Sequence, residues 1–115
     1  MIARETYKMA LNMLGYKDTD MFKEKSVVLV NRVYADLFYS LNPNGEFEPI
    51  KSLQDTIDLP QKVLHDVFPY GLAGFLAQSE SDGDSQQLYM SIYNGKKNRL
   101  NNVASIEDVI PYPEG

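Results

Sequence analysis

The amino-acid sequence predicts an all-α fold in a single domain. Along four stretches of the chain, apolar residues recur three and four positions apart, which is the spacing of one face of an α-helix. Proline, glycine and asparagine stand between these stretches, where helices end and turns form. The chain has 115 residues, of which 43% are hydrophobic, so its length and composition suit one globular domain with its own core.

The first two predicted helices cover residues 2–14 and 20–41. Gly15 follows the first, where a residue in the left-handed conformation commonly ends a helix. Residues 18–20 supply capping and acidic first-turn side chains for the second helix, and residues 42–45 end it with proline and glycine. The apolar stripes consist of Tyr7, Ala10, Leu11 and Leu14 in the first helix and of Val30, Val33, Tyr34, Leu37, Phe38 and Leu41 in the second.

Residues 46–59 lack a sustained helical stripe and contain Pro49. We predict a connecting loop here, with at most one short strand around residues 50–53. A loop of this length in a compact domain is usually functional or packed by its own side chains. Four apolar residues favour the packed loop: Ile50, Leu53, Ile57 and Leu59.

The third predicted helix covers residues 60–79, with Pro60 in its first turn and a kink or break at Pro69. Gly71 and Gly74 make one side of this helix small. Because glycine inside a helix costs about 1 kcal/mol relative to alanine, we predict that another helix approaches closely there. The simplest partner is the long second helix, through Val33 or Leu37.

The fourth predicted helix covers residues 85–99, after a polar turn at residues 79–84. It ends in the basic residues Lys96, Lys97 and Arg99, which suit the negative end of a helix dipole. A phosphate-binding role for these three residues is the alternative.

Residues 103–115 contain Pro111 and Pro113 and are predicted to be an extended C-terminal tail. We therefore divide the chain into a helical domain, residues 1–102, and this tail. A short tail cannot bury its apolar residues by itself, so we predict that it either packs on its own helices or acts as a binding arm on another subunit or partner, by strand addition or groove docking. The contact residues would be Val103, Ile106, Val109, Ile110 and Tyr112.

The chain carries few residues that suggest chemistry. It has no cysteine and one histidine, which excludes cysteine-ligated metal sites and clusters of histidines. His65 is interpreted as a helix-surface residue, and Asp82-Gly83-Asp84 lacks the further ligands of a calcium loop. No phosphate-binding glycine loop or nucleophile motif is present. We therefore expect no catalytic centre, cofactor or metal, and no small-molecule substrate.

Net charge and hydropathy further restrict which class of protein this chain can belong to. With 11 basic and 16 acidic residues the net charge is −5, so the chain lacks the basic surface of a duplex-DNA binder. Its longest strongly apolar run, residues 27–30, is far shorter than the roughly 20 residues that span a bilayer. A cytoplasmic protein is expected, with no signal peptide.

The order of motifs in residues 50–100 resembles the small head–tail connector, or adaptor, proteins of tailed bacteriophages and prophages. In that family a segment ending in an apolar residue and proline opens a helix, and a "PYGLA…LA" stretch follows. An acid-rich turn then leads to a last helix with a central tyrosine and basic residues after it. The corresponding positions are Ser52–Pro60, Pro69–Ala77, Glu80–Asp84, Tyr93 and Lys96–Arg99.

This resemblance implies a structural protein without enzymatic activity. It would join a ring of identical subunits below the portal protein, extend the DNA channel and dock a neck or tail completion protein. DNA would pass through the ring without sequence-specific binding, a role that an acidic surface suits. The protein would lie in the bacterial cytoplasm during assembly and then in the virion neck.

Two other classes stay open. One is a free-standing helical interaction module, such as a small host regulator that binds a partner through an apolar face. The other is a minor enzyme or ligand-binding helical domain with His65 at its site, which would require convergent polar groups around that side chain.

Overall fold

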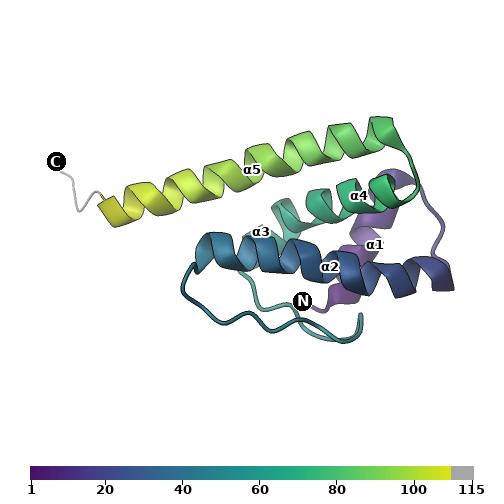
Figure 1. The fold of residues 1–115 in the computed structure, drawn as a ribbon, viewed down its shortest axis with the longest axis horizontal. Helices are drawn as coiled ribbons and strands as arrows, with labels where there is room; N and C mark the ends of the chain where they lie inside the picture. The colour runs from purple at the N-terminus through teal and green to yellow at the C-terminus, as the bar shows by residue number, and fades with distance from the viewer. Residues whose placement is uncertain (110–115) are drawn as a thin grey trace.

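A computed structural model describes the backbone of residues 1–109 and the side chains of residues 1–100, and over this part the chain is all-α (Figure 1). The helices are α1 (Ala3–Leu14), α2 (Asp20–Leu41), α3 (Gln61–Asp66), α4 (Phe68–Ser79) and α5 (Gly83–Val109). The first two agree with the predicted helices to within one residue. The predicted all-α, single-domain fold is confirmed.

Helix α4 occupies the centre of the bundle. It packs against each of the other four helices and lies between α2 and α5 in Figure 1. Its buried positions surround the whole helix, as expected for a helix covered on every side: Phe68, Pro69, Gly71, Leu72, Ala73, Gly74, Leu76 and Ala77. The stretch that carries the resemblance to connector proteins is thus the middle of the core.

The predicted packed loop is confirmed. Its apolar side chains Ile50, Leu53 and Ile57 are buried in the core. The loop also satisfies the first turn of α1, because the backbone N–H of Ala3 donates to the carbonyl of Asp55 and that of Arg4 to the carbonyl of Leu53, both at 2.8 Å. Within the described residues the only extended pairing is one antiparallel bridge, between Ile2 and Thr56, so the short strand at residues 50–53 does not form.

Asn31 of α2 holds the start of this loop. Its side-chain amide accepts a hydrogen bond from the Ile50 backbone N–H at 2.7 Å and donates one to the Ile50 carbonyl at 2.9 Å. Both backbone groups of a buried residue are therefore satisfied by one side chain, as burial requires. The Tyr34 hydroxyl provides a further contact by accepting from the backbone N–H of Asp58 at 3.0 Å.

The predicted break in the third helix is confirmed, and it separates α3 from α4. Val67 stands between them with φ −117° and ψ −51°. Pro69 lies in the first turn of α4, where its missing N–H removes no helical hydrogen bond. Continuing α3 through Pro69 would remove such a bond and bring the ring against the preceding turn.

The C-terminal boundary is wrong in the prediction. Helix α5 begins at Gly83, after the capping residue Asp82, and continues to Val109 instead of ending at residue 99. Residues 103–109 are therefore helical and not an extended tail. The prolines that motivated the tail begin only at Pro111, and they restrict the chain no earlier than the residue before them. Residues 110–115 lie outside the described part.

Candidate functional site

The two glycines of α4 lie against α5, which corrects their predicted partner. A Cβ atom on Gly71 would stand 2.7 Å from the Tyr93 ring, and one on Gly74 would stand 2.7 Å from Cγ and 3.3 Å from the backbone nitrogen of Met90. The predicted close helix approach is thus confirmed, but α5 and not α2 makes it. Sequence periodicity identified the small side of α4 without identifying which helix faces it.

Tyr93 links three helices at this contact. Its ring is 1% exposed against Gly71, and its hydroxyl donates to Oδ2 of Asp36 on α2 at 2.5 Å. The Lys97 ammonium lies 2.9 Å from the same carboxylate oxygen. Burial, and then the hydrogen bond to Asp36, raise the pKa of Tyr93 above its usual range. The phenol therefore stays protonated, and Asp36 receives one neutral and one charged donor.

A groove runs beside this network, between α2 and α5. It encloses about 410 Å³, and its walls come from three helices. Phe75 of α4 and Met90 of α5 give it an apolar part, and its polar part consists of both charges and neutral groups: Arg32, Asp36, Tyr93, Asn94 and Lys97. We call this cavity the α2–α5 groove.

The Arg32 side chain has a defined place in the groove. Its guanidinium carbon lies 4.1 Å from the centre of the Phe75 ring, the arrangement of a cation–π contact. A guanidinium held over an aromatic ring keeps its charge and its N–H donors. Such a group recognises carboxylates in a directional manner.

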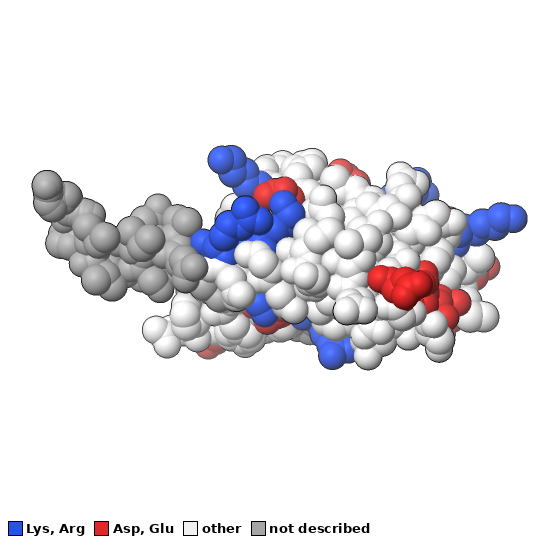
Figure 2. Space-filling view, turned by 90° about the horizontal axis from the view of Figure 1, so that it is seen from above, with Lys and Arg blue, Asp and Glu red and all other residues white. Residues whose placement is uncertain are grey.

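The basic residues of α5 do not lie at a helix end, because the helix continues past them. Lys96 pairs with Asp66 of α3 at 2.9 Å and lies 5.2 Å from the centre of the Tyr70 ring. Lys97 pairs with Asp36, as described above. The helix dipole thus does not explain these residues; two of them join α5 to neighbouring helices. Figure 2, which looks down on α5, shows a group of Lys and Arg side chains with acidic atoms among them next to the residues drawn in grey, and a patch of Asp and Glu toward the other end, where Lys and Arg side chains also project.

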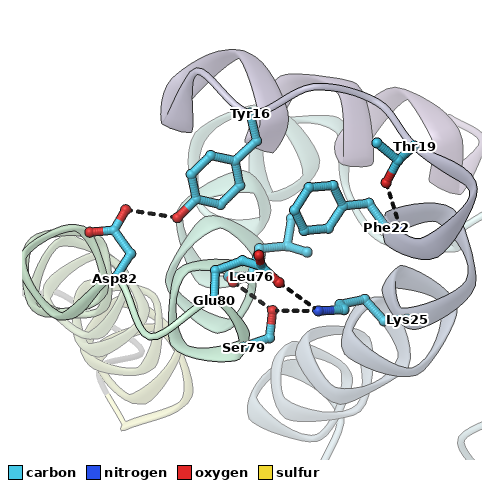
Figure 3. Close-up of polar contacts among 8 residues, drawn as sticks. All are labelled: Tyr16, Thr19, Phe22, Lys25, Leu76, Ser79, Glu80 and Asp82. Atoms are coloured by element: carbon cyan, nitrogen blue, oxygen red, sulfur yellow. Dashed lines mark hydrogen bonds and ion pairs between the residues drawn. The ribbon is translucent and has the colours of Figure 1, made fainter.

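The turn between α4 and α5 is joined by a hydrogen bond to Tyr16, which lies between α1 and α2, and by an ion pair to Lys25 of α2 (Figure 3). The Tyr16 hydroxyl donates to Oδ2 of Asp82 at 2.7 Å, and the Lys25 ammonium lies 2.8 Å from Oε2 of Glu80. The Tyr16 and Phe22 rings stack with their centres 5.6 Å apart. Burial and the hydrogen bond to Asp82 raise the pKa of Tyr16 to about 12, and the same hydrogen bond lowers the pKa of Asp82.

The acid-rich turn is therefore a packed connection between helices. Over the described residues, no group of three or more His, Cys, Asp or Glu side chains is placed to hold a metal ion. The predicted turn forms but is shorter than 79–84: only residues 80–82 lie outside helices, because α4 continues to Ser79 and α5 begins at Gly83. Asp82 also caps α5, because it accepts from the backbone N–H of Ser85 at 3.4 Å.

His65 is exposed, as the interpretation of a surface histidine requires. It lies in an open hollow with Gln61, Lys62 and Asp66, all from the short helix α3. Among the described residues no hydroxyl group lines this hollow. An acid–base role for His65 would need a nucleophile nearby, and the residues that line this hollow supply no hydroxyl group for it.

The predicted tail contacts divide into two sets. Val103, Ile106 and Val109 belong to the last turns of α5, whose backbone alone is described, and Ile110 and Tyr112 lie outside the described residues. The α2–α5 groove was not predicted from sequence. Its residues come from three helices that are far apart in the chain, and only the apolar and cationic character of each one separately is visible in the sequence.

Within the described residues, no helix has the length and apolar character needed to cross a membrane. Comparison of the chain with protein-family models, curated proteins and solved structures gives no match.

Proposed function

We propose that this chain is a structural subunit of a phage or prophage head–tail connector, a ring seated between the portal and the neck or tail proteins. The observation that carries the proposal is a contact between the motifs of the resemblance. Gly71 of the "PYGLA" stretch lies directly against Tyr93, the central tyrosine of the last helix. The two motifs therefore pack directly against each other. We expect a chain with the same motifs in the same order to pack its last two helices in the same way.

Shape also supports this proposal. The chain extends over 53 × 30 × 18 Å, and Figure 1 shows the C-terminal part of α5 continuing past the end of α2. A helix that projects from its own bundle presents surface to other molecules. Repeated contacts between unlike surfaces of identical chains close into rings when the rotation between neighbours permits.

The second candidate is a helical interaction module, and the exposed side of α2 favours it. Met21 and Val28 are both 69% exposed, and a spacing of seven residues places them on the same side of the helix. The charged residues Glu24 and Lys25 lie between them on that side, so a partner would contact two separate apolar side chains and not a continuous apolar patch. A module of this kind would bind its partner as a monomer or dimer.

Assembly with the cognate portal separates the two candidates. The chain is co-expressed with the portal protein encoded near it, and the complex is measured by light scattering and electron microscopy. A connector adds many copies to one portal ring, whereas a module adds none. Failure to bind the portal and every neighbouring neck protein would contradict the connector.

A matched pair of variants identifies the surface used. Met21→Lys on α2 and Leu88→Lys on α5 each replace an exposed apolar side chain, 69% and 55% exposed, by a cation. Both should fold normally, because neither side chain is part of the core. A module that binds through α2 loses its partner only in the first variant.

A further inference from the structure

We propose that the α2–α5 groove of one chain binds residues 110–115 of a second copy of the same chain. The proposal goes beyond the connector function and does not depend on it. It is carried by the composition of the groove, by the position at which α5 ends, and by the charge of the segment that follows.

The groove and the segment match in chemistry. The groove combines the apolar side chains Phe75 and Met90 with the cation Arg32, beside Lys97, whose ammonium is paired with Asp36 at 2.9 Å. The segment Ile110-Pro111-Tyr112-Pro113-Glu114-Gly115 combines two large apolar residues with one carboxylate. Its two prolines restrict the chain to extended conformations, which lowers the entropy lost when a segment enters a groove.

Charge favours the same pairing. The sequence from residue 101 to residue 115 contains three acidic residues, Glu107, Asp108 and Glu114, and no lysine or arginine. The guanidinium carbon of Arg32 lies 4.1 Å from the centre of the Phe75 ring, and an arginine guanidinium can donate two hydrogen bonds to one carboxylate, here that of the arriving segment.

Reach excludes the Met90 end of the groove of the same chain. Met90 precedes the end of α5 at Val109 by 19 residues, which is about 28 Å along the helix. Tyr112 follows that end by three residues, so its Cα atom lies within about 11 Å of the helix end. Ile110 and Tyr112 thus cannot contact Met90 of their own chain, and the groove is available to those of another copy.

Disulfide trapping tests the contact in the whole protein, because the chain has no native cysteine. Chains carrying Tyr112→Cys are mixed with chains carrying Asn94→Cys, in the groove, and oxidised mildly. One variant carries a larger tag, so the mixed dimer has its own mass. A disulfide requires Cα atoms within about 7 Å, and we expect the mixed dimer to form.

Gly95→Cys is the matched control. Gly95 is the next residue on α5, it is exposed, and an added Cβ there meets nothing within 4 Å. The mixture of Tyr112→Cys with Gly95→Cys should give at least several-fold less mixed dimer. Equal trapping at both positions, or none at Asn94, overturns the proposal.

Charge reversal provides a second readout. Arg32→Glu in the Asn94→Cys chain should reduce the trapping rate several-fold, whereas Lys62→Glu, the same charge change on α3, should not. An unchanged rate with Arg32→Glu overturns the assignment to this groove. Because these measurements use only the purified chain, failure to bind a portal would leave their result intact.

Discussion

At the scale of single residues, glycine determines how closely α4 and α5 approach. Gly71 lies against a tyrosine ring that is buried and hydrogen-bonded, so that ring cannot move away. Gly74 lies against the flexible side chain of Met90. Gly95, on the exposed side of α5, has open space around it. Substituting alanine at these three positions therefore distinguishes two effects on stability. At Gly71 and Gly74 the added methyl group meets a neighbouring side chain, whereas at Gly95 only helix propensity changes.

We expect Gly71→Ala to destabilise the fold by about 1–3 kcal/mol, because the added methyl overpacks a rigid contact. Gly74→Ala should cost less, since the methionine can adopt another rotamer. Gly95→Ala should instead stabilise the fold, by up to about 1 kcal/mol, through helix propensity alone. Urea unfolding of the three variants measures these differences. A Gly71→Ala variant as stable as Gly95→Ala would contradict the close contact.

Two hydrogen bonds between a tyrosine and a carboxylate make the stability of the fold depend on pH. The Tyr7 hydroxyl donates to Asp18 and the Tyr16 hydroxyl to Asp82, and each bond lowers the pKa of its carboxyl. A carboxyl with a lower pKa in the folded state contributes stability above its unfolded pKa of about 3.9. That contribution is lost as the pH falls through the folded pKa. Stability should therefore decrease below about pH 4.

Tyr16→Phe tests this dependence. Without the hydroxyl, the pKa of Asp82 should return toward its usual value, so less stability is lost between pH 7 and pH 3 than in the unchanged chain. Tyr39→Phe removes a hydroxyl from an exposed ring and is the control. Unfolding free energies at the two pH values give the comparison, and identical losses in all three chains would refute the role of Tyr16.

At the scale of elements, one side chain holds the long loop to α2. Asn31→Ala leaves the N–H and carbonyl of buried Ile50 without their partner and should cost about 1–3 kcal/mol. Asn12→Ala, an exposed position on α1, should change stability by less than about 0.5 kcal/mol. Thermal or urea unfolding distinguishes them. Equal effects would mean that water replaces the Asn31 amide.

The sequence predicts the start or end of a helix correctly where a local capping or breaking residue determines it. Gly15 is left-handed with φ 73°, Thr19 caps α2 by accepting from the Phe22 N–H, and Pro69 separates α3 from α4. The end of α5 was not predictable in this way. Its basic residues have the composition of a helix terminus, but Lys96 and Lys97 pair with carboxylates of other helices. Only tertiary structure distinguishes these two uses of a lysine.

The candidate site was less predictable than the fold for a related reason. The spacing of glycines indicated a close helix contact, but which helix makes it depends on the order in which helices pack. The α2–α5 groove depends on the same order, because Arg32, Phe75 and Met90 are brought together only when α4 lies between α2 and α5. The predicted contacts within residues 103–112 rest on the apolar character of those residues, which does not specify what they contact.

At the scale of the whole molecule, the side chains described, those of residues 1–100, contain one buried cluster, and Leu100 of α5 packs against it. The buried cluster extends from Ala3 to Tyr93, whereas α5 continues to Val109. A chain ending at residue 100 keeps this whole cluster and should therefore still unfold in one cooperative transition. A chain ending at residue 92 lacks Tyr93 and should lose cooperative unfolding. Circular dichroism during urea titration tests both chains. Loss of cooperative unfolding in the chain that ends at residue 100 would contradict the prediction that residues 1–100 contain a sufficient core.

The bonding of α1 to the loop and to α4 has a consequence for synthesis. The first turn of α1 requires the carbonyls of Leu53 and Asp55, and its apolar side packs on α4. The earliest helix to leave the ribosome therefore has no folded partner until roughly 65 further residues have been added, which takes roughly 3 to 13 s at cellular rates. During that interval its apolar stripe is without its folded partner α4, so slower translation through residues 15–79 lengthens the time for which the stripe is open to chaperones and to neighbouring nascent chains.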